Sequence, residues 1–314
     1  MKKEEKDMAV SKVFGEQVVA EVRNAMGDRF DISLHEVTKN NGSVFTGLTI
    51  RKMDENIAPT VYLEGYEDQY SKQEKTIKEI GEDITTVYRK NCGEKSGFTV
   101  EELSNVFKDG EKLLDGILPK VVNTERNKEY LQNVPHVDFL DLSVVFVYMI
   151  STTYNGSGTA SFTVTNVHAE NLGIKPEQMY EHALENMKRD GYKIRRMEDV
   201  LTGFIGGETT DSVIPDGCPR MLVITNESKI NGAAAMLWPE LFEKACGNLY
   251  VNLWILPCSI HEVICIPKEG SVEFGKLRTM VSEINATQLM PEEILSDNVY
   301  IYRSTTGAIE IAEY

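Results

Sequence analysis

The longest apolar run of the chain, residues 250–267, is the feature that most constrains its fold. It reads YVNLWILPCSIHEVICIP, and its β-branched and aromatic residues favour buried strands. Pro257 has no backbone N–H to donate to a neighbouring strand, so the run predicts two strands that separate near this residue. The polar residues from Ser259 to Glu262 then stand in the middle of a buried segment, and their role becomes the main functional question.

Periodicity and turn signals predict alternating groups of strands and helices along the rest of the chain. Helices are expected at Phe14–Met26 with a stop at Gly27, Ile77–Tyr88, Thr99–Leu118, Pro176–Met187, Pro239–Ala245 and Phe274–Ile284. Strands are expected at Phe30–Lys39, Ser43–Arg51, Ala58–Leu63, Phe139–Thr152, Ala160–Val167, Arg220–Thr225, Gly232–Leu237, Val299–Arg303 and Ile309–Ala312. The Gly-rich segment Gly203–Pro219 is expected to form a long surface loop or a lid.

This order predicts an α/β protein of the α+β type, with mixed, mostly antiparallel sheets and helices packed on their faces. A chain of 314 residues accommodates either one large domain or two ordinary ones. We expect an N-terminal lobe at residues 1–125 and a C-terminal lobe at residues 126–314, or one continuous domain.

The charge of the chain argues against two classes of partner. The formal net charge is −16, which repels nucleic acid backbones and anionic membrane surfaces. A local basic run at Lys188–Arg196 is accompanied by the acidic residues Asp190, Glu198 and Asp199, so we interpret it as a solvated helix end.

The cysteines and the N-terminus predict a reduced, cytoplasmic protein. The five cysteines are odd in number and widely spaced, which argues against a disulfide framework and a zinc ribbon. Residues 1–7 are charged and no apolar segment follows, so we expect no signal peptide. No apolar stretch reaches the roughly 18–20 residues that span a bilayer.

The spacing of His261 and Cys265 resembles part of a metal-binding helix but does not predict a metal site. On a strand, these two residues would lie about 13 Å apart at a rise of roughly 3.3 Å per residue. Two ligands of one zinc ion cannot be so far apart. We therefore expect no bound metal and no cofactor.

Two interpretations of the polar residues remain open. Strand alternation places Ser259 and His261 on one face, as a nucleophile and its base require, but places Glu262 on the other. A hydrolase would then need an acid from elsewhere in the chain. The alternative is a buried histidine with an architectural role. His136 is a weaker candidate for acid–base chemistry, because a loop histidine that caps the next strand is the better explanation.

Several stretches spread over nearly the whole chain resemble an uncharacterised bacterial family, domain of unknown function 5688. They are Thr38–Gly42 before Thr46–Leu48, Pro59–Leu63, Val134–His136 before Phe139 and Asp141–Leu142, Leu256–Val263, and Leu295–Asp297 before Val299–Tyr300. The resemblance implies one unit along the chain and no activity, because none is assigned to the family.

The function that we expect is therefore a cytoplasmic binding or regulatory role exerted through protein contacts. The alternative is a hydrolase that uses Ser259 and His261. A protein partner is consistent with the sequence, whereas the oligomeric state stays open.

Overall fold

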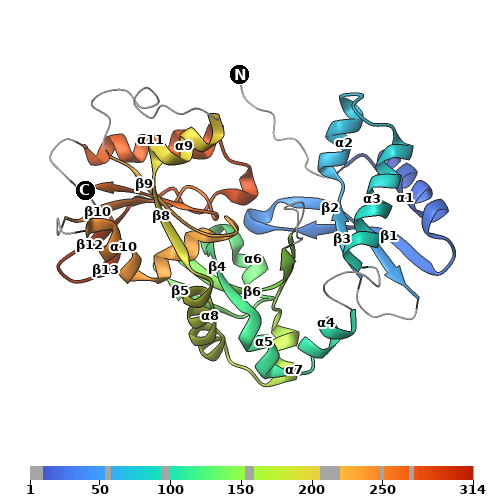
Figure 1. The fold of residues 1–314 in the computed structure, drawn as a ribbon, viewed down its shortest axis with the longest axis horizontal. Helices are drawn as coiled ribbons and strands as arrows, with labels where there is room; N and C mark the ends of the chain where they lie inside the picture. Colours follow the sequence, from blue (N-terminus) through green and yellow to red (C-terminus); the bar gives the residue numbers. More distant parts are fainter. Residues whose placement is uncertain are drawn as a thin grey trace. The chain divides into compact units, whose positions relative to one another are not determined.

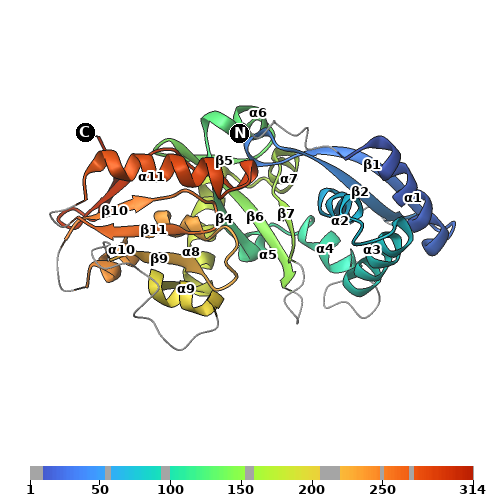
Figure 2. The same cartoon turned by 90° about the horizontal axis from the view of Figure 1, so that it is seen from above.

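The computed structural model describes residues 10–53, 58–92, 100–152, 159–205, 220–247, 251–268 and 272–313. The chain forms two compact units (Figures 1 and 2). The first unit comprises residues 1–112 and 149–162, and the second comprises residues 113–148 and 163–314. The predicted division near residue 125 stays a prediction. The expected loop from Gly203 to Pro219 lies outside the described residues from residue 206 onward.

The first unit is a small antiparallel sheet with helices packed against it. Its elements are α1 (Lys12–Met26), β1 (Phe30–Thr38), η1 (Asn40–Gly42), β2 (Val44–Lys52), β3 (Thr60–Tyr62), α2 (Glu64–Ser71), α3 (Ile77–Cys92) and α4 (Val100–Val106). The strand order is β1-β2-β3. Fully buried Val18, Ile50 and Ile80 come from α1, β2 and α3 and share one apolar core. Helix α2 was missed by the sequence analysis, because it buries none of its residues and so lacks an apolar stripe.

Local chemistry explains the limits of α1. The Ser11 hydroxyl accepts a hydrogen bond of 3.3 Å from the backbone N–H of Phe14, which satisfies one free donor of the first turn. At the other end, Gly27 adopts a φ of 79°, a conformation that other residues rarely take. The predicted helix and its stop at Gly27 are confirmed.

The predicted helix from Thr99 to Leu118 is confirmed only in part, and Thr99 itself lies outside the described residues. The chain instead forms α4, then α5 (Gly110–Gly116), and from Ile117 onward it forms a strand, β4 (Ile117–Asn123). Pro119 lies inside β4, where it is paired with Phe146. Because β4 is at the edge of its sheet, the missing N–H of proline leaves no neighbour unpaired.

The rest of the chain belongs mainly to the second unit. Its elements after β4 are η2 (Glu125–Asn127), α6 (Lys128–Leu131), β5 (His136–Phe139), β6 (Leu142–Thr152), β7 (Thr159–Thr163), α7 (Asn166–Leu172), α8 (Pro176–Asp190), β8 (Tyr192–Arg196), α9 (Met197–Ile205), β9 (Leu222–Asn226), η4 (Gly232–Leu237), α10 (Pro239–Cys246), β10 (Leu253–Leu256), β11 (Val263–Pro267), α11 (Phe274–Thr287), η6 (Pro291–Glu293), β12 (Tyr300–Arg303) and β13 (Ala308–Ile311). One sheet has the order β4-β6-β5, with β7 paired to β6.

The larger sheet of the second unit has the order β13-β12-β10-β11-β9-β8 and is covered on both faces. Helix α11 covers one face, where the rings of Trp254 and Phe274 are 5.8 Å apart. Helix α10 covers the other face, where the rings of Phe242 and Tyr302 are 5.7 Å apart (Figure 1). The predicted pair of strands on either side of Pro257 is confirmed as β10 and β11.

The strand predicted at Gly232–Leu237 was wrong, since this segment is the 3-10 helix η4. All of its residues are buried. A Cβ atom on Gly232 would lie 2.2 Å from Thr225 Oγ1 and 2.4 Å from the carbonyl oxygen of His261. The small residues Gly-Ala-Ala-Ala therefore serve close packing against the sheet, which strand propensity does not register.

The predicted fold class is confirmed. The described residues form an α+β arrangement in which the sheets are mostly antiparallel and helices pack on their faces. Within those residues, none of the helices combines the length and the hydropathy needed to cross a bilayer.

Candidate functional site

The connection between β10 and β11 carries the residues on which the sequence analysis focused. Its backbone pairs with residues 293–296: the N–H of Ile260 donates to the carbonyl of Glu293, and the N–H of Leu295 donates to the carbonyl of Cys258, both at 2.8 Å. Residues 257–262 are therefore not part of either strand. The predicted strand alternation across this segment was wrong, because its backbone partners lie outside the sheet.

Ser259 is buried, and its hydroxyl already has partners. Ser259 is only 4% exposed. Its Oγ accepts a hydrogen bond of 3.0 Å from the backbone N–H of His261, and the hydroxyl is close enough to the carboxyl group of Glu262 to lower the pKa of that group. Among the described residues, no hydrogen bond joins this hydroxyl to the imidazole of His261, which is the contact that an activated serine makes to its base.

The imidazole of His261 is fixed from two sides. Its Nδ1 accepts a hydrogen bond of 3.3 Å from the backbone N–H of Asn231, which assigns the proton of the neutral ring to Nε2. Nε2 lies 4.0 Å from a carboxylate oxygen of Glu293, and the two side chains are 30% and 35% exposed. Burial lowers the pKa of His261, the charge of Glu293 partly opposes this, and Lys120 lowers it further.

The pKa of Glu262 is shifted in the opposite direction. Burial raises the pKa of its carboxyl group, the hydrogen bond from Ser259 opposes the rise, and the nearby charge of Glu293 adds to it. The structure therefore brings His261, Glu262 and Glu293 together as a half-buried group of titratable side chains. The acid beside His261 is Glu293, which the sequence analysis did not identify, because it reaches the imidazole from a segment 32 positions further along the chain.

His136 does not join this group. It begins β5, and its Nδ1 is 3.0 Å from the carbonyl oxygen of Val134, which is the local capping contact of a strand-end histidine. Among the described residues, no hydrogen bond or ion pair links it to His261.

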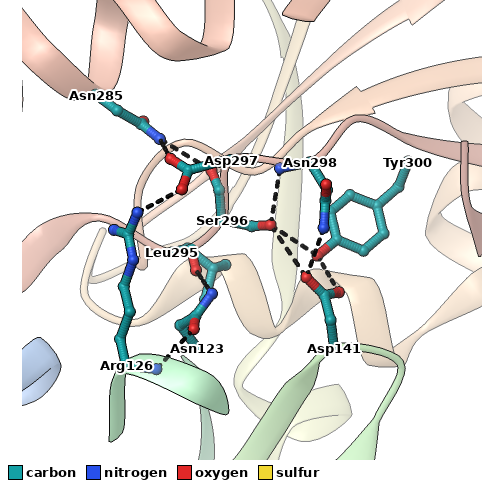
Figure 3. A network of polar contacts seen from close by, with 9 residues as sticks. All are labelled: Asn123, Arg126, Asp141, Asn285, Leu295, Ser296, Asp297, Asn298 and Tyr300. Atoms are coloured by element: carbon teal, nitrogen blue, oxygen red, sulfur yellow. Dashed lines mark hydrogen bonds and ion pairs between the residues drawn. The ribbon is translucent and has the colours of Figure 1, made fainter.

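A partly buried polar network lies next to the β10–β11 connection, and we call it the polar junction (Figure 3). Its members come from β4, η2, the β5–β6 turn, α11 and residues 295–300. They are Asn123, Arg126, Asp141, Asn285, Leu295, Ser296, Asp297, Asn298 and Tyr300.

The polar junction joins segments that are distant in sequence. Asn123 donates a hydrogen bond of 3.1 Å to the carbonyl of Leu295. The carboxylate of Asp141 accepts hydrogen bonds from the Tyr300 hydroxyl and from the Asn298 amide. Burial first, and then the hydrogen bond with Asp141, raise the pKa of the Tyr300 phenol. Apart from Asn285 Oδ1, which is buried without a hydrogen-bond partner among the described residues, these groups satisfy one another, so the polar junction has the features of a structural network.

A cavity of about 520 Å³ lies elsewhere in the second unit, at the β8 edge of the larger sheet. Four cationic residues line it: Arg195 and Arg196 at the end of β8, Arg220 before β9, and Lys244 in the last turn of α10. Asp199 of α9 is the one carboxylate residue among its described lining residues. We call this site the basic cavity.

The cations of the basic cavity have no acidic partner among the described residues. Within the described part of the chain, no ion pair joins any of the four to a carboxylate. Lys244 instead lies 5.5 Å from the centre of the Trp238 ring. Such an excess of unpaired positive charge is unusual in a chain whose net charge is −16.

Sequence reasoning missed the basic cavity for a simple reason. The run Lys188–Arg196 contains only two of its cations, and neighbouring acidic residues made that run look like a solvated surface. Arg220 and Lys244 reach the same place through the fold. The available signal was the pair Arg195-Arg196 at the end of a strand.

No group of three or more histidine, cysteine, aspartate or glutamate side chains in the described residues has the geometry to hold a metal ion.

Comparison with known proteins identifies a family for this chain. No curated protein and no solved structure is significantly similar to this chain. A family model described as a family of unknown function, DUF5688, matches residues 11–304. Because this match spans most of the sequence, the chain belongs to the DUF5688 family.

Proposed function

We propose that this protein is a binding protein whose ligand is a small anion held in the basic cavity. The observation that carries the proposal is the lining itself: among the described lining residues, four are cationic, Arg195, Arg196, Arg220 and Lys244, and one is a carboxylate, Asp199. Cavities of a few hundred Å³ are the usual size of small-molecule sites. The expected binding or regulatory role is thereby narrowed to an anionic ligand, and a role through protein contacts stays a prediction.

Local electrostatics favour an anion in spite of the acidic chain. Charges more than about 8 Å away are largely screened at physiological ionic strength, so the nearby cations dominate the potential in the cavity. Guanidinium groups present forked N–H donors that match the oxygens of phosphate and carboxylate groups. The C-terminal turn of α10 also borders the cavity, and its carbonyl groups oppose an anion, so the cations must outweigh this smaller effect.

The residues of the cavity support binding more than catalysis. Cys246 is the nucleophilic residue among its described lining residues. Its thiol donates a hydrogen bond of 3.0 Å to the carbonyl of Val251, and burial raises its pKa. The thiol therefore stays protonated at neutral pH, and a protonated thiol is a poor nucleophile.

The hydrolase alternative gains no support from the β10–β11 connection. The hydroxyl of Ser259 is bonded to a backbone N–H, and the imidazole of His261 is bonded to a different loop. His261 and Glu262 are also absent from the lining of the basic cavity.

Isothermal titration calorimetry with inorganic phosphate, at constant ionic strength, tests the proposal. We expect saturable binding, and we expect Arg196→Gln or Arg220→Gln to weaken it about tenfold, as the loss of a charged hydrogen bond does. Arg278→Gln on the exposed face of α11 is the matched control, because it removes the same charge away from the cavity. Absence of saturation up to about 10 mM phosphate, or an equal loss in the control, would reject the proposal.

A further inference from the structure

The composition of the basic cavity points to a narrower class of ligand. We infer that it binds a phosphate monoester whose substituent is apolar. This inference rests on the proposed anion binding and adds a chemical identity to the ligand.

The strand register places an apolar surface beside the cations. Arg196 is paired with Leu222, so the two side chains share one face of the sheet. Leu253 is paired with Pro267 in the adjoining strands, and both also line the cavity. Arg196 is exposed whereas Leu253 is fully buried. The cavity therefore has a cationic rim and an apolar floor.

The charge count favours a dianion over a monoanion. Among the described lining residues, four cations and one carboxylate leave a formal excess of three positive charges. A phosphate monoester carries a charge of about −1.5 to −2 at pH 7, because its second pKa is about 6. A carboxylate carries at most one negative charge and neutralises less of this excess.

The volume requires more than the anionic group. Inorganic phosphate would occupy the rim of a cavity of about 520 Å³ and leave the floor in contact with water. An apolar substituent would displace that water, and each buried CH₂ equivalent strengthens binding about fourfold. We therefore expect the ester to bind at least about tenfold more tightly than phosphate alone.

Three probes separate the parts of this inference in a calorimetric titration of the full chain. Phenyl phosphate supplies both the dianion and the apolar group, inorganic phosphate supplies only the anion, and benzoate pairs a similar ring with a monoanion. We expect phenyl phosphate to bind at least about tenfold more tightly than either of the others.

Two variants locate the two contributions. Arg196→Gln should weaken inorganic phosphate and phenyl phosphate by the same factor of about ten. Val251→Thr places a hydroxyl in the apolar lining at nearly constant volume, so it should weaken phenyl phosphate alone. Val167→Thr on exposed α7 is its matched control and should change neither affinity.

The possible failures are distinguishable. Equal affinities for inorganic and phenyl phosphate would overturn the apolar substituent and leave anion binding intact. Benzoate binding as tightly as phenyl phosphate would overturn the preference for a dianion. Absence of binding by all three probes would reject the proposed function itself.

Discussion

Removing one hydroxyl from the polar junction should measurably lower the free energy of unfolding. Tyr300 is fully buried, and its hydroxyl bonds to the carboxylate of Asp141 and, at 3.0 Å, to Ser296 Oγ. Tyr300→Phe keeps the ring and removes both bonds. A hydrogen bond to a charged group contributes about 1.5–3 kcal/mol, so we expect the free energy of unfolding of the second unit to fall by about that amount.

Tyr302→Phe is a matched control on the same strand. Tyr302 is 3% exposed, and within the described residues no hydrogen bond of its hydroxyl is found. Its removal should therefore change the free energy of unfolding by less than about 0.5 kcal/mol.

Urea unfolding followed by tryptophan fluorescence measures these losses of unfolding free energy in the second unit. The chain has 2 tryptophans, Trp238 and Trp254, and both belong to the second unit. The slope of the free energy against urea should stay unchanged, because the substitution does not alter the area exposed on unfolding. Equal losses in the two variants, or no loss in Tyr300→Phe, would refute the assignment of the polar junction as a stabilising network.

Four further outcomes follow from the β10–β11 connection and its neighbours. Ser259→Ala should lower the free energy of unfolding by about 1–3 kcal/mol, since it leaves buried groups unpaired; urea melts in which it matches the parent would contradict the observed contacts. Because burial lowers the pKa of His261, the folded protein binds this proton less tightly than the unfolded chain, so stability present above about pH 6.5 is lost as the pH falls. Melts at about pH 5.5 and 7.5 should show a smaller difference for His261→Asn than for the parent. The raised pKa of Glu262 means that its ionised form opposes folding near neutral pH, so Glu262→Gln should be stabilising at pH 7, and a destabilised variant would count against this sign. Burial raises the pKa of Cys258 to about 12, so its thiol should react with a disulfide reagent only after unfolding, and rapid labelling of the native protein at Cys258 would contradict its burial.

Elements with a single strong local signal could be predicted from the sequence. The apolar stripe and Gly27 define α1, and the β-branched run broken at Pro257 defines β10 and β11. In these cases the local preference and the tertiary environment agree. The errors arose where they disagree: Ile117 continues a helical pattern but belongs to the edge strand β4, and Gly232 begins a 3-10 helix because the backbone approaches so closely.

The candidate site was less predictable than the fold. Sequence analysis identified Ser259, His261 and Glu262 as unusual polar residues, and the structure brings them together. It could not supply Glu293 or the loop residue Asn231, because both reach His261 through tertiary contacts. The basic cavity was harder still, since two of its cations come from separate segments and its apolar floor exists only after strand pairing.

The polar junction also sets an order of events during synthesis of the chain. Asn123 and Leu295 are separated by 172 residues, and Asp141 and Tyr300 by 159. At about 5–20 residues per second, a ribosome needs roughly 10–35 s to supply the second partner after the first has emerged. During that interval the side-chain N–H of Asn123 and the carboxylate of Asp141 depend on water in place of these two partners, and β4 and β6 lack the segment that completes their surroundings. The second unit is therefore expected to finish folding only when residues 295–300 have left the ribosome.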